Sequence, residues 1–336
     1  METSAYLRPL VWLVPLLAGA VASCAPARHA GMSGLVASGA FSVSEGASLP
    51  RGRGGHAAGN VDGCVVVAGG NDWSADRATK FWLKDSVVYR RGQWVSGPSL
   101  PSPVAYGMFA HDANGLYLAG GEDGSTKLRE TYALTSLAGG GRWRTLAPLP
   151  TATSGGAGAF ACGRFYVACG ETADGMSNQV WSLEPSKPGA TWQPCQPIPG
   201  VARAFPSLVA CGSHVYLLGG VSGWSPLTPL RDAYEYDPTT DRWKRLADLP
   251  WPGYAWAADA IDDAHLLLAG QADGQIHADV WILQIPEMTA RKIGNAAIQT
   301  TTAPLIRTVS REWLLLGGEP DSNRTRTPRV TVIRAE

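Results

Sequence analysis

The sequence predicts an all-β protein built from six similar units, because an apolar run ending in a glycine pair recurs at nearly constant spacing. The gaps between the first members of successive pairs are 51, 49, 50, 51 and 47 residues. The pairs, two of them incomplete, are Gly69-Gly70, Gly120-Gly121, Cys169-Gly170, Gly219-Gly220, Gly270-Gln271 and Gly317-Gly318. We expect each glycine where a strand end approaches neighbouring backbone too closely for a side chain.

A tryptophan followed seven residues later by a proline recurs in four units, in step with the glycine pairs. These pairs are Trp94 and Pro101, Trp143 and Pro150, Trp192 and Pro199, and Trp243 and Pro250. Another short run, such as Ser86 to Tyr89, lies between glycine pair and tryptophan. Each unit is therefore expected to be an antiparallel meander of about four strands. The 40 Gly, 24 Pro and 13 Trp agree with many short strands and tight turns.

This pattern resembles the kelch family, whose four-stranded units form the blades of a β-propeller. The resemblance covers roughly residues 40 to 334 and implies six blades. The last unit has one strand after its glycine pair and then stops, whereas Phe41 to Val43 precedes Leu49-Pro50 as an outer strand does elsewhere. We expect this N-terminal strand to complete the sixth blade and to close the ring, which removes exposed sheet edges.

The N-terminus has a different pattern. Arg8, an apolar stretch from Leu10 to Ala20 and the ending Val21-Ala22-Ser23-Cys24 predict a secretory signal over residues 1–23, too short for a membrane span. The ending resembles a bacterial lipobox, which implies cleavage before Cys24 and lipidation of its sulfur; an ordinary signal peptide is the alternative. Residues 24–39 would then be a flexible tether and residues 40–336 the propeller. The protein is expected to be an exported lipoprotein of the cell envelope, on the periplasmic side of the outer membrane or at the cell surface.

Charge and motifs exclude several classes of function. The chain has 28 basic and 28 acidic residues and no basic stripe, so nucleic acid is not expected as a partner. It has no pair of CxxC motifs, no HExxH motif and no histidine cluster, so neither a metal nor a cofactor is predicted. Most of the five cysteines after Cys24 are interpreted as core or turn residues.

In a propeller, the residues just after the glycine pairs lie in loops around one mouth of the central channel. By sequence these are Asn71, Glu122, Glu171, Val221, Gln271 and Glu319. The three glutamates predict an acidic, converging site, the alternative being that each one caps its own loop. Arg203 precedes an inner-strand pattern and either reaches the same pocket or forms a blade-to-blade salt bridge. An axial pocket is the default binding site.

One unit is more specific. Gly317-Gly318-Glu319, followed by Arg326 before an apolar strand, resembles the Asn-Gly-Glu and Leu-Arg-Thr-Asp strings of the sialic-acid mutarotase (N-acetylneuraminate epimerase) family, with one extra residue between. Other units, including Ala105-Tyr106-Gly107 and the one at Arg203, resemble that family in rotated order, as in its cyclically permuted members. The Leu-Arg-Thr-Asp string is not intact in this chain, because Thr325 precedes Arg326 and Pro328 follows Thr327. Arg324 competes with Arg326 for the role of the family's arginine.

The resemblance implies interconversion of sialic-acid anomers by acid-base ring opening, without a cofactor. Glu319 would transfer the proton, and Arg326, or else Arg324, would meet the sugar carboxylate bidentately. Arg203, Glu122 and Glu171 are the further candidates for substrate binding. A non-catalytic kelch module that binds a glycan or a protein at the cell envelope is the alternative, and galactose-oxidase-like chemistry is a distant third.

Overall fold

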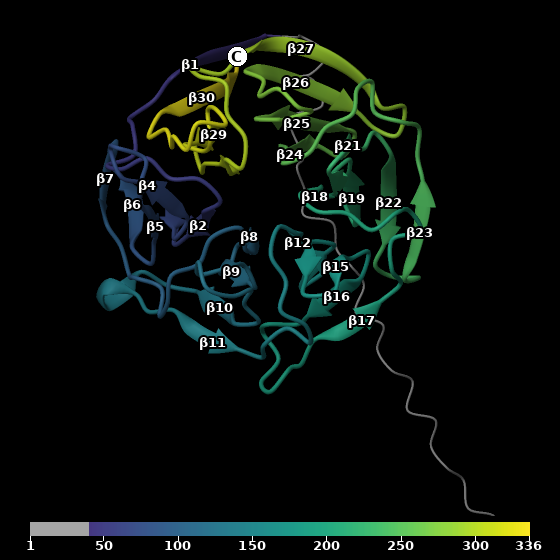
Figure 1. The fold of residues 1–336 in the computed structure, drawn as a ribbon, viewed down its shortest axis with the longest axis horizontal. Helices are drawn as coiled ribbons and strands as arrows, with labels where there is room; N and C mark the ends of the chain where they lie inside the picture. Colours follow the sequence, from purple (N-terminus) through teal and green to yellow (C-terminus); the bar gives the residue numbers. More distant parts are fainter. Residues whose placement is uncertain (1–39) are drawn as a thin grey trace, which may run out of the picture.

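The computed structural model describes residues 40–336, which form six four-stranded antiparallel sheets arranged in a ring (Figure 1). The prediction of an all-β, six-bladed propeller is confirmed. The predicted signal segment, Cys24 and the tether lie outside the described residues. From residue 40 to 336, no helix has the length and apolar character needed to cross a bilayer.

The blades are numbered along the chain, and the strands of each are given from the channel outwards. The first has β2 (Ala57–Val61), β3 (Cys64–Ala68), β6 (Ser86–Arg90) and β7 (Gln93–Ser96). The second has β8 (Met108–Asp112), β9 (Gly115–Ala119), β10 (Thr131–Leu134) and β11 (Arg144–Leu146). The third has β12 (Ala157–Ala161), β13 (Arg164–Ala168), β16 (Val180–Leu183) and β17 (Gln193–Cys195).

The fourth blade has β18 (Ser207–Cys211), β19 (His214–Leu218), β22 (Ala233–Asp237) and β23 (Arg242–Arg245). The fifth has β24 (Ala257–Asp262), β25 (His265–Ala269), β26 (Asp279–Gln284) and β27 (Thr289–Asn295). The sixth has β28 (Leu305–Arg307), β29 (Glu312–Leu316), β30 (Val330–Ala335) and β1 (Phe41–Glu45). A short 3₁₀ helix, η1 (Ala138–Gly140), lies between β10 and β11.

The outer strand of the sixth blade comes from the beginning of the described chain. β1 pairs antiparallel with β30, with Phe41 opposite Ala335 and Glu45 opposite Thr331. Figure 1 shows this purple strand beside the yellow C-terminal strands. Both ends of the described chain therefore lie in one sheet.

The hydrophobic core is divided among the blade interfaces. Each of the six interfaces between neighbouring blades has one cluster of buried side chains, including the interface between the sixth blade and the first. The inner strands contact one another in order around the ring, from β2 through β28 and back to β2. Because packing is between blades, the axis is left to the backbone of the inner strands and to the residues that precede them.

The repeated tryptophans explain how neighbouring blades are joined. Trp143 Nε1 donates to the Pro98 carbonyl at 2.8 Å, and Pro98 lies in the chain segment that leaves the outer strand of the preceding blade. The tryptophans of the first, third and fourth blades make the same bond, at 2.8 to 2.9 Å. The indole thus fills the space between outer strands and satisfies a carbonyl there.

The first glycine pair behaves as predicted. Gly69 and Gly70 have φ values of +67° and +92°. A Cβ on Gly69 would lie 2.5 Å from the Val104 carbonyl oxygen, which also accepts the Gly70 amide hydrogen at 2.7 Å. The first glycine is required by this close approach, and the second donates the hydrogen bond that links one blade to the next.

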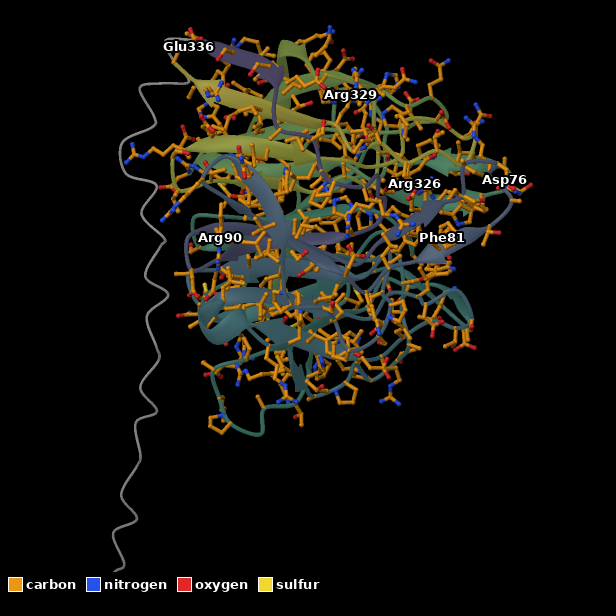
Figure 2. All side chains as sticks on the ribbon, turned by 90° about the vertical axis from the view of Figure 1, so that its left-hand side faces the viewer. Asp76, Phe81, Arg90, Arg326, Arg329 and Glu336 are labelled. Carbon is orange, nitrogen blue, oxygen red and sulfur yellow. The ribbon has the colours of Figure 1, made fainter. Side chains whose placement is uncertain are left out.

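Three short hairpins extend the loops that follow the glycine pairs. They are β4 (Asn71–Trp73) with β5 (Lys80–Trp82), β14 (Glu171–Thr172) with β15 (Gly175–Met176), and β20 (Val221–Trp224) with β21 (Leu227–Pro229). The edge-on view of Figure 2 shows Phe81 of the first hairpin, together with Asp76 and Arg326, toward one face of the ring. Arg90 and Glu336 lie toward the other face.

Candidate functional site

The residues that follow the glycine pairs occupy equivalent places around the ring. Each forms an antiparallel bridge with a residue just before the inner strand of its own blade. The six are Asn71, Glu122, Glu171, Val221, Ala272 and Glu319. In the fifth blade this corrects the sequence-based assignment of Gln271 to the set. Gln271 takes the place of the second glycine, and its buried side chain accepts a hydrogen bond from Trp251 Nε1 at 2.7 Å.

A second set of equivalent residues encircles the channel between these bridges and the inner strands. All six have positive φ, from 48° to 64°, and five of them donate their amide to the carbonyl of the equivalent residue one blade back. They are Gly55, Tyr106, Gly155, Phe205, Ala255 and Thr302. With residues of the inner strands they line a cavity of about 160 Å³. Four are not glycine, and a side chain in this backbone region costs roughly 1 kcal/mol or more, a strain that is frequent at functional sites.

Glu319 lies beside this second set. Its Oε1 accepts hydrogen bonds from the Tyr106 hydroxyl at 2.8 Å and from Thr302 Oγ1 at 3.1 Å. Its Oε2 is 3.3 Å from Arg326 Nη2. Two hydroxyls and a guanidinium, from the second and sixth blades, therefore fix the carboxylate, whose side chain remains 19% exposed.

Arg326 is nearly buried, and each nitrogen of its guanidinium has a partner. Nε donates to Asn71 Oδ1 at 2.8 Å, and Nη1 donates to the Thr325 carbonyl at 2.7 Å. Nη2 faces Glu319 and also donates to the Tyr106 hydroxyl oxygen at 3.4 Å. The structure thus brings together the two residues that the mutarotase resemblance singles out, on the same rim of the ring.

A glycine leaves the room for this pair. A Cβ on Gly54 would lie 2.7 Å from Glu319 Cγ and 2.8 Å from Arg326 Cδ and Nε. Gly54 also accepts a hydrogen bond from Asn71 Nδ2 at 3.1 Å. The backbone of Gly54 therefore packs directly against the carboxylate and guanidinium side chains and orients the amide that holds Arg326.

Tyr106 is the central donor of the cluster. Burial raises the pKa of its hydroxyl well above the ordinary value, and the negative charge of Glu319 raises this pKa further. The phenol therefore stays protonated at neutral pH and donates to Glu319. One edge of the same ring packs against Phe205, with centroids 5.9 Å apart.

Lys80 and Glu122 extend the cluster toward the second blade. The Lys80 ammonium lies over the rings of Trp82 and Tyr106, at 4.1 and 5.2 Å from their centroids. Burial lowers the pKa of Lys80, an effect that the negative charges of Glu122 and Glu319 oppose. Burial raises the pKa of Glu122, and the Lys80 charge opposes that shift. The predicted Glu122 is thus part of the same electrostatic group as Glu319.

Glu171 and Arg324 have partners other than Glu319. Glu171 accepts a hydrogen bond from Trp224 Nε1, and its Oε2 is 3.8 Å from Lys127 Nζ. The guanidinium of Arg324 stacks over Trp73 at 4.8 Å from the ring centroid. Arg324 is exposed, so Arg326 rather than Arg324 is the arginine that meets Glu319.

Arg203 is placed elsewhere, although sequence reasoning made it a candidate for substrate binding. Its side chain is fully buried, and its Nη1 and Nη2 donate to Asp232 at 2.6 and 2.8 Å. Nη1 also donates to the Gly219 carbonyl at 2.9 Å. This is a salt bridge within the fourth blade, and Arg53 makes the corresponding pair with Asp85 in the first blade.

Sequence reasoning missed the roles of several residues of the cluster. Tyr106, Asn71 and Lys80 come from segments far from Glu319 in the sequence, so no motif spacing connects them with it. Thr302 lies 17 residues before Glu319, but no pattern marked it. One signal was present for Tyr106, since it occupies a repeat position where the first and third units have glycine. A bulky side chain at such a position indicates a functional constraint.

Within residues 40–336, no three His, Cys, Asp or Glu side chains gather in a way that would hold a metal ion. The Kelch motif matches residues 202–250, which span the fourth blade. A comparison with curated proteins gave no match. The fold and the site therefore define a six-bladed β-propeller that contains a Kelch motif and carries a charged, tyrosine-centred cluster at one mouth of its channel.

Proposed function

We propose that this protein interconverts the anomers of a sialic-acid-type sugar at the cluster around Glu319. The observation that carries the proposal is the contact of the Glu319 carboxylate with Arg326 and with the Tyr106 hydroxyl beside the channel cavity. The mutarotase resemblance selected Glu319 and Arg326 from the sequence alone. A partly exposed carboxylate that is held in place by neighbouring groups, as Glu319 is by Arg326 and Tyr106, is what a proton-transfer site needs.

The reaction requires a proton to leave one oxygen of the sugar and another to reach a second oxygen. The anomeric hydroxyl loses its proton to the Glu319 carboxylate as a carbonyl forms at the anomeric carbon. The bond to the ring oxygen breaks, its electron pair goes to that oxygen, and the protonated Glu319 returns its proton there. Closure on the other carbonyl face gives the other anomer. Tyr106 and Thr302 keep Glu319 oriented through both steps, and positioned acid-base groups of this kind accelerate proton transfer about 10²- to 10⁴-fold.

The test is NMR measurement of anomeric exchange in freshly dissolved N-acetylneuraminate. Glu319→Gln keeps the shape of the side chain but cannot accept the proton, so we expect the catalysed exchange rate to fall at least about 10²-fold. Glu287→Gln, in an exposed turn between β26 and β27, is the matched control and should exchange at the wild-type rate. A Glu319→Gln protein as active as wild type would remove the mechanism.

A row of aromatic rings favours a second candidate, binding of a glycan without catalysis. From Tyr106 the row continues through Phe205, Trp224 and Tyr254, with successive centroids 5.8 to 5.9 Å apart. Trp224 is 45% exposed and offers a stacking surface for a sugar ring. Saturation-transfer NMR that detects sugar binding to a protein with no catalysed exchange would support this candidate instead.

We also propose attachment to the cell envelope through Cys24, on the basis of the lipobox-like ending alone. Metabolic labelling with a fatty acid tests it. Label and membrane association should both disappear in a Cys24→Ser variant. An unlabelled, secreted wild-type protein would instead indicate an ordinary signal peptide.

A further inference from the structure

Lys80 is a cation held in an unusual way at the rim of the site. It begins β5, and its ammonium lies over the rings of Trp82, Tyr106 and Trp73, at 4.1, 5.2 and 6.0 Å from their centroids. The first hairpin is close to the second blade here, because a Cβ on Gly124 would lie 2.2 Å from Trp82 Nε1. Aromatic faces stabilise a cation but accept no ordinary hydrogen bond from it.

The ammonium of Lys80 has three N–H donors. Its contacts among the described residues are with aromatic rings, and it forms no hydrogen bond or ion pair with them. Glu122 and Glu319 act on it through their charge but lie outside ion-pair distance. A half-buried ammonium without an acceptor is suited to meet an anionic group of a ligand.

The arginines of the rim are less suited to that role. Arg326 uses Nε, Nη1 and Nη2 on protein groups, and its side chain is 5% exposed. Arg324 is exposed, its guanidinium stacks over Trp73, and its Nη1 donates to the Arg77 carbonyl at 3.4 Å. Lys80, in contrast, lies over the ring of Tyr106, whose hydroxyl donates to Glu319.

We propose that Lys80 binds the carboxylate of the substrate, and that the substrates are therefore 2-keto sugar acids, in which that carboxylate is attached to the anomeric carbon. This rests on the proposed function. In such a sugar the carboxylate and the anomeric hydroxyl share one carbon, so an anion held by Lys80 brings the hydroxyl to Glu319 and Tyr106. Arg326 is then a positioning residue that orients Glu319. A uronic acid has its carboxylate on C5, which the ring oxygen separates from the anomeric carbon, so an anion held by Lys80 would not place the anomeric hydroxyl at Glu319.

The experiment compares N-acetylneuraminate with its methyl ester, which has the same ring but no negative charge. Both the exchange rate and the binding constant are measured by NMR, for wild type, Lys80→Met and Lys84→Met. Methionine keeps the apolar stem against Trp82, and Lys84 is an exposed lysine four residues later, so Lys84→Met is the matched control. Thermal unfolding verifies that each variant is folded.

Wild type and Lys84→Met should bind the acid roughly 10- to 100-fold more tightly than the ester, the range of a charge-assisted hydrogen bond. Lys80→Met should bind the two alike, and glucuronate should bind weakly to all three. Preference for the acid that survives in Lys80→Met would overturn the proposal, even if wild type catalyses exchange. If wild type prefers the acid to the ester, Lys80→Met does not, and no exchange is catalysed, the carboxylate site is supported and the proposed function is refuted. Absence of binding by wild type would overturn both.

Discussion

Gly54→Ala tests whether the Glu319–Arg326 pair works in the geometry described. The bridge position that Gly54 occupies is filled by Ala105, Ser154, Ala204, Tyr254 and Thr301 in the other blades. The backbone at this position therefore accommodates a side chain, and a methyl group at residue 54 is excluded only by the facing side chains of Glu319 and Arg326. That group would lie 2.7 to 2.8 Å from atoms of Glu319 and Arg326, whereas ordinary contact begins near 3.4 Å.

The magnitude follows from this overlap. Gly54 is held by two backbone hydrogen bonds to Asn71, of 3.0 and 2.9 Å, so the side chains must move rather than the strand. A displacement of about 0.7 Å for each clears the contact. A misplacement of about 1 Å at a reacting group costs on the order of 10²-fold in rate. Overpacking of this kind destabilises by about 1–3 kcal/mol.

The assay is the same NMR exchange measurement, with urea unfolding to measure stability. We expect Gly54→Ala to exchange anomers about 10- to 100-fold more slowly than wild type while remaining folded. Ser154→Ala, at the equivalent position of the third blade, should keep the wild-type rate. An unchanged exchange rate in folded Gly54→Ala would refute the idea that Glu319 and Arg326 act from these positions.

Three further predictions concern stability. Trp143→Phe loses the indole bond to Pro98, and we expect a loss of about 1–2 kcal/mol in the free energy of unfolding, measured with urea. Arg203→Met leaves the partly buried Asp232 without its cationic partner and should cost about 3 kcal/mol, yet the exchange rate of the folded protein should be unchanged if Arg203 only stabilises its own blade. Burial raises the pKa of Asp259 to about 6. As pH rises from about 4 to 6, this carboxyl ionises in the unfolded chain before it ionises in the folded protein, so the free energy of unfolding should fall over this range. Because the residue is not completely buried, we expect a fall of about 1–2 kcal/mol, which should be absent in Asp259→Asn when unfolding is compared at pH 4 and pH 7.

The repeat pattern was sufficient for the architecture, because each of its signals has a local cause. The first glycine is required in three of the pairs because a carbonyl oxygen lies about 2.5 Å from the position that a Cβ would take, at Gly69, Gly120 and Gly219. The tryptophan at or next to the outer strand of four blades is required because its indole donates to a carbonyl of the preceding blade. Such requirements recur in most of the blades and are therefore visible as a period of about fifty residues.

The fifth blade shows where pattern reading fails. Its glycine pair is incomplete, and counting from the wrong member placed Gln271 on the rim, where the bridge with Tyr254 places Ala272. A shift of one residue reverses the direction of a side chain in extended backbone. Arg203 shows a second limit, since a cation before an inner strand is compatible with a ligand site or an internal salt bridge until its neighbours are known.

The period, the glycines and the tryptophans thus establish the blades, and the resemblance selects Glu319 and Arg326, because these features lie within single units of the chain. The site is assembled from residues more than two hundred positions apart, with Tyr106 bonded to Glu319 and Asn71 bonded to Arg326. Only the ring arrangement of the blades brings side chains of the second and sixth blades together at one channel mouth. The partners of the carboxylate, the free donors of Lys80 and the internal role of Arg203 were therefore decided by tertiary contacts, which no local pattern encodes.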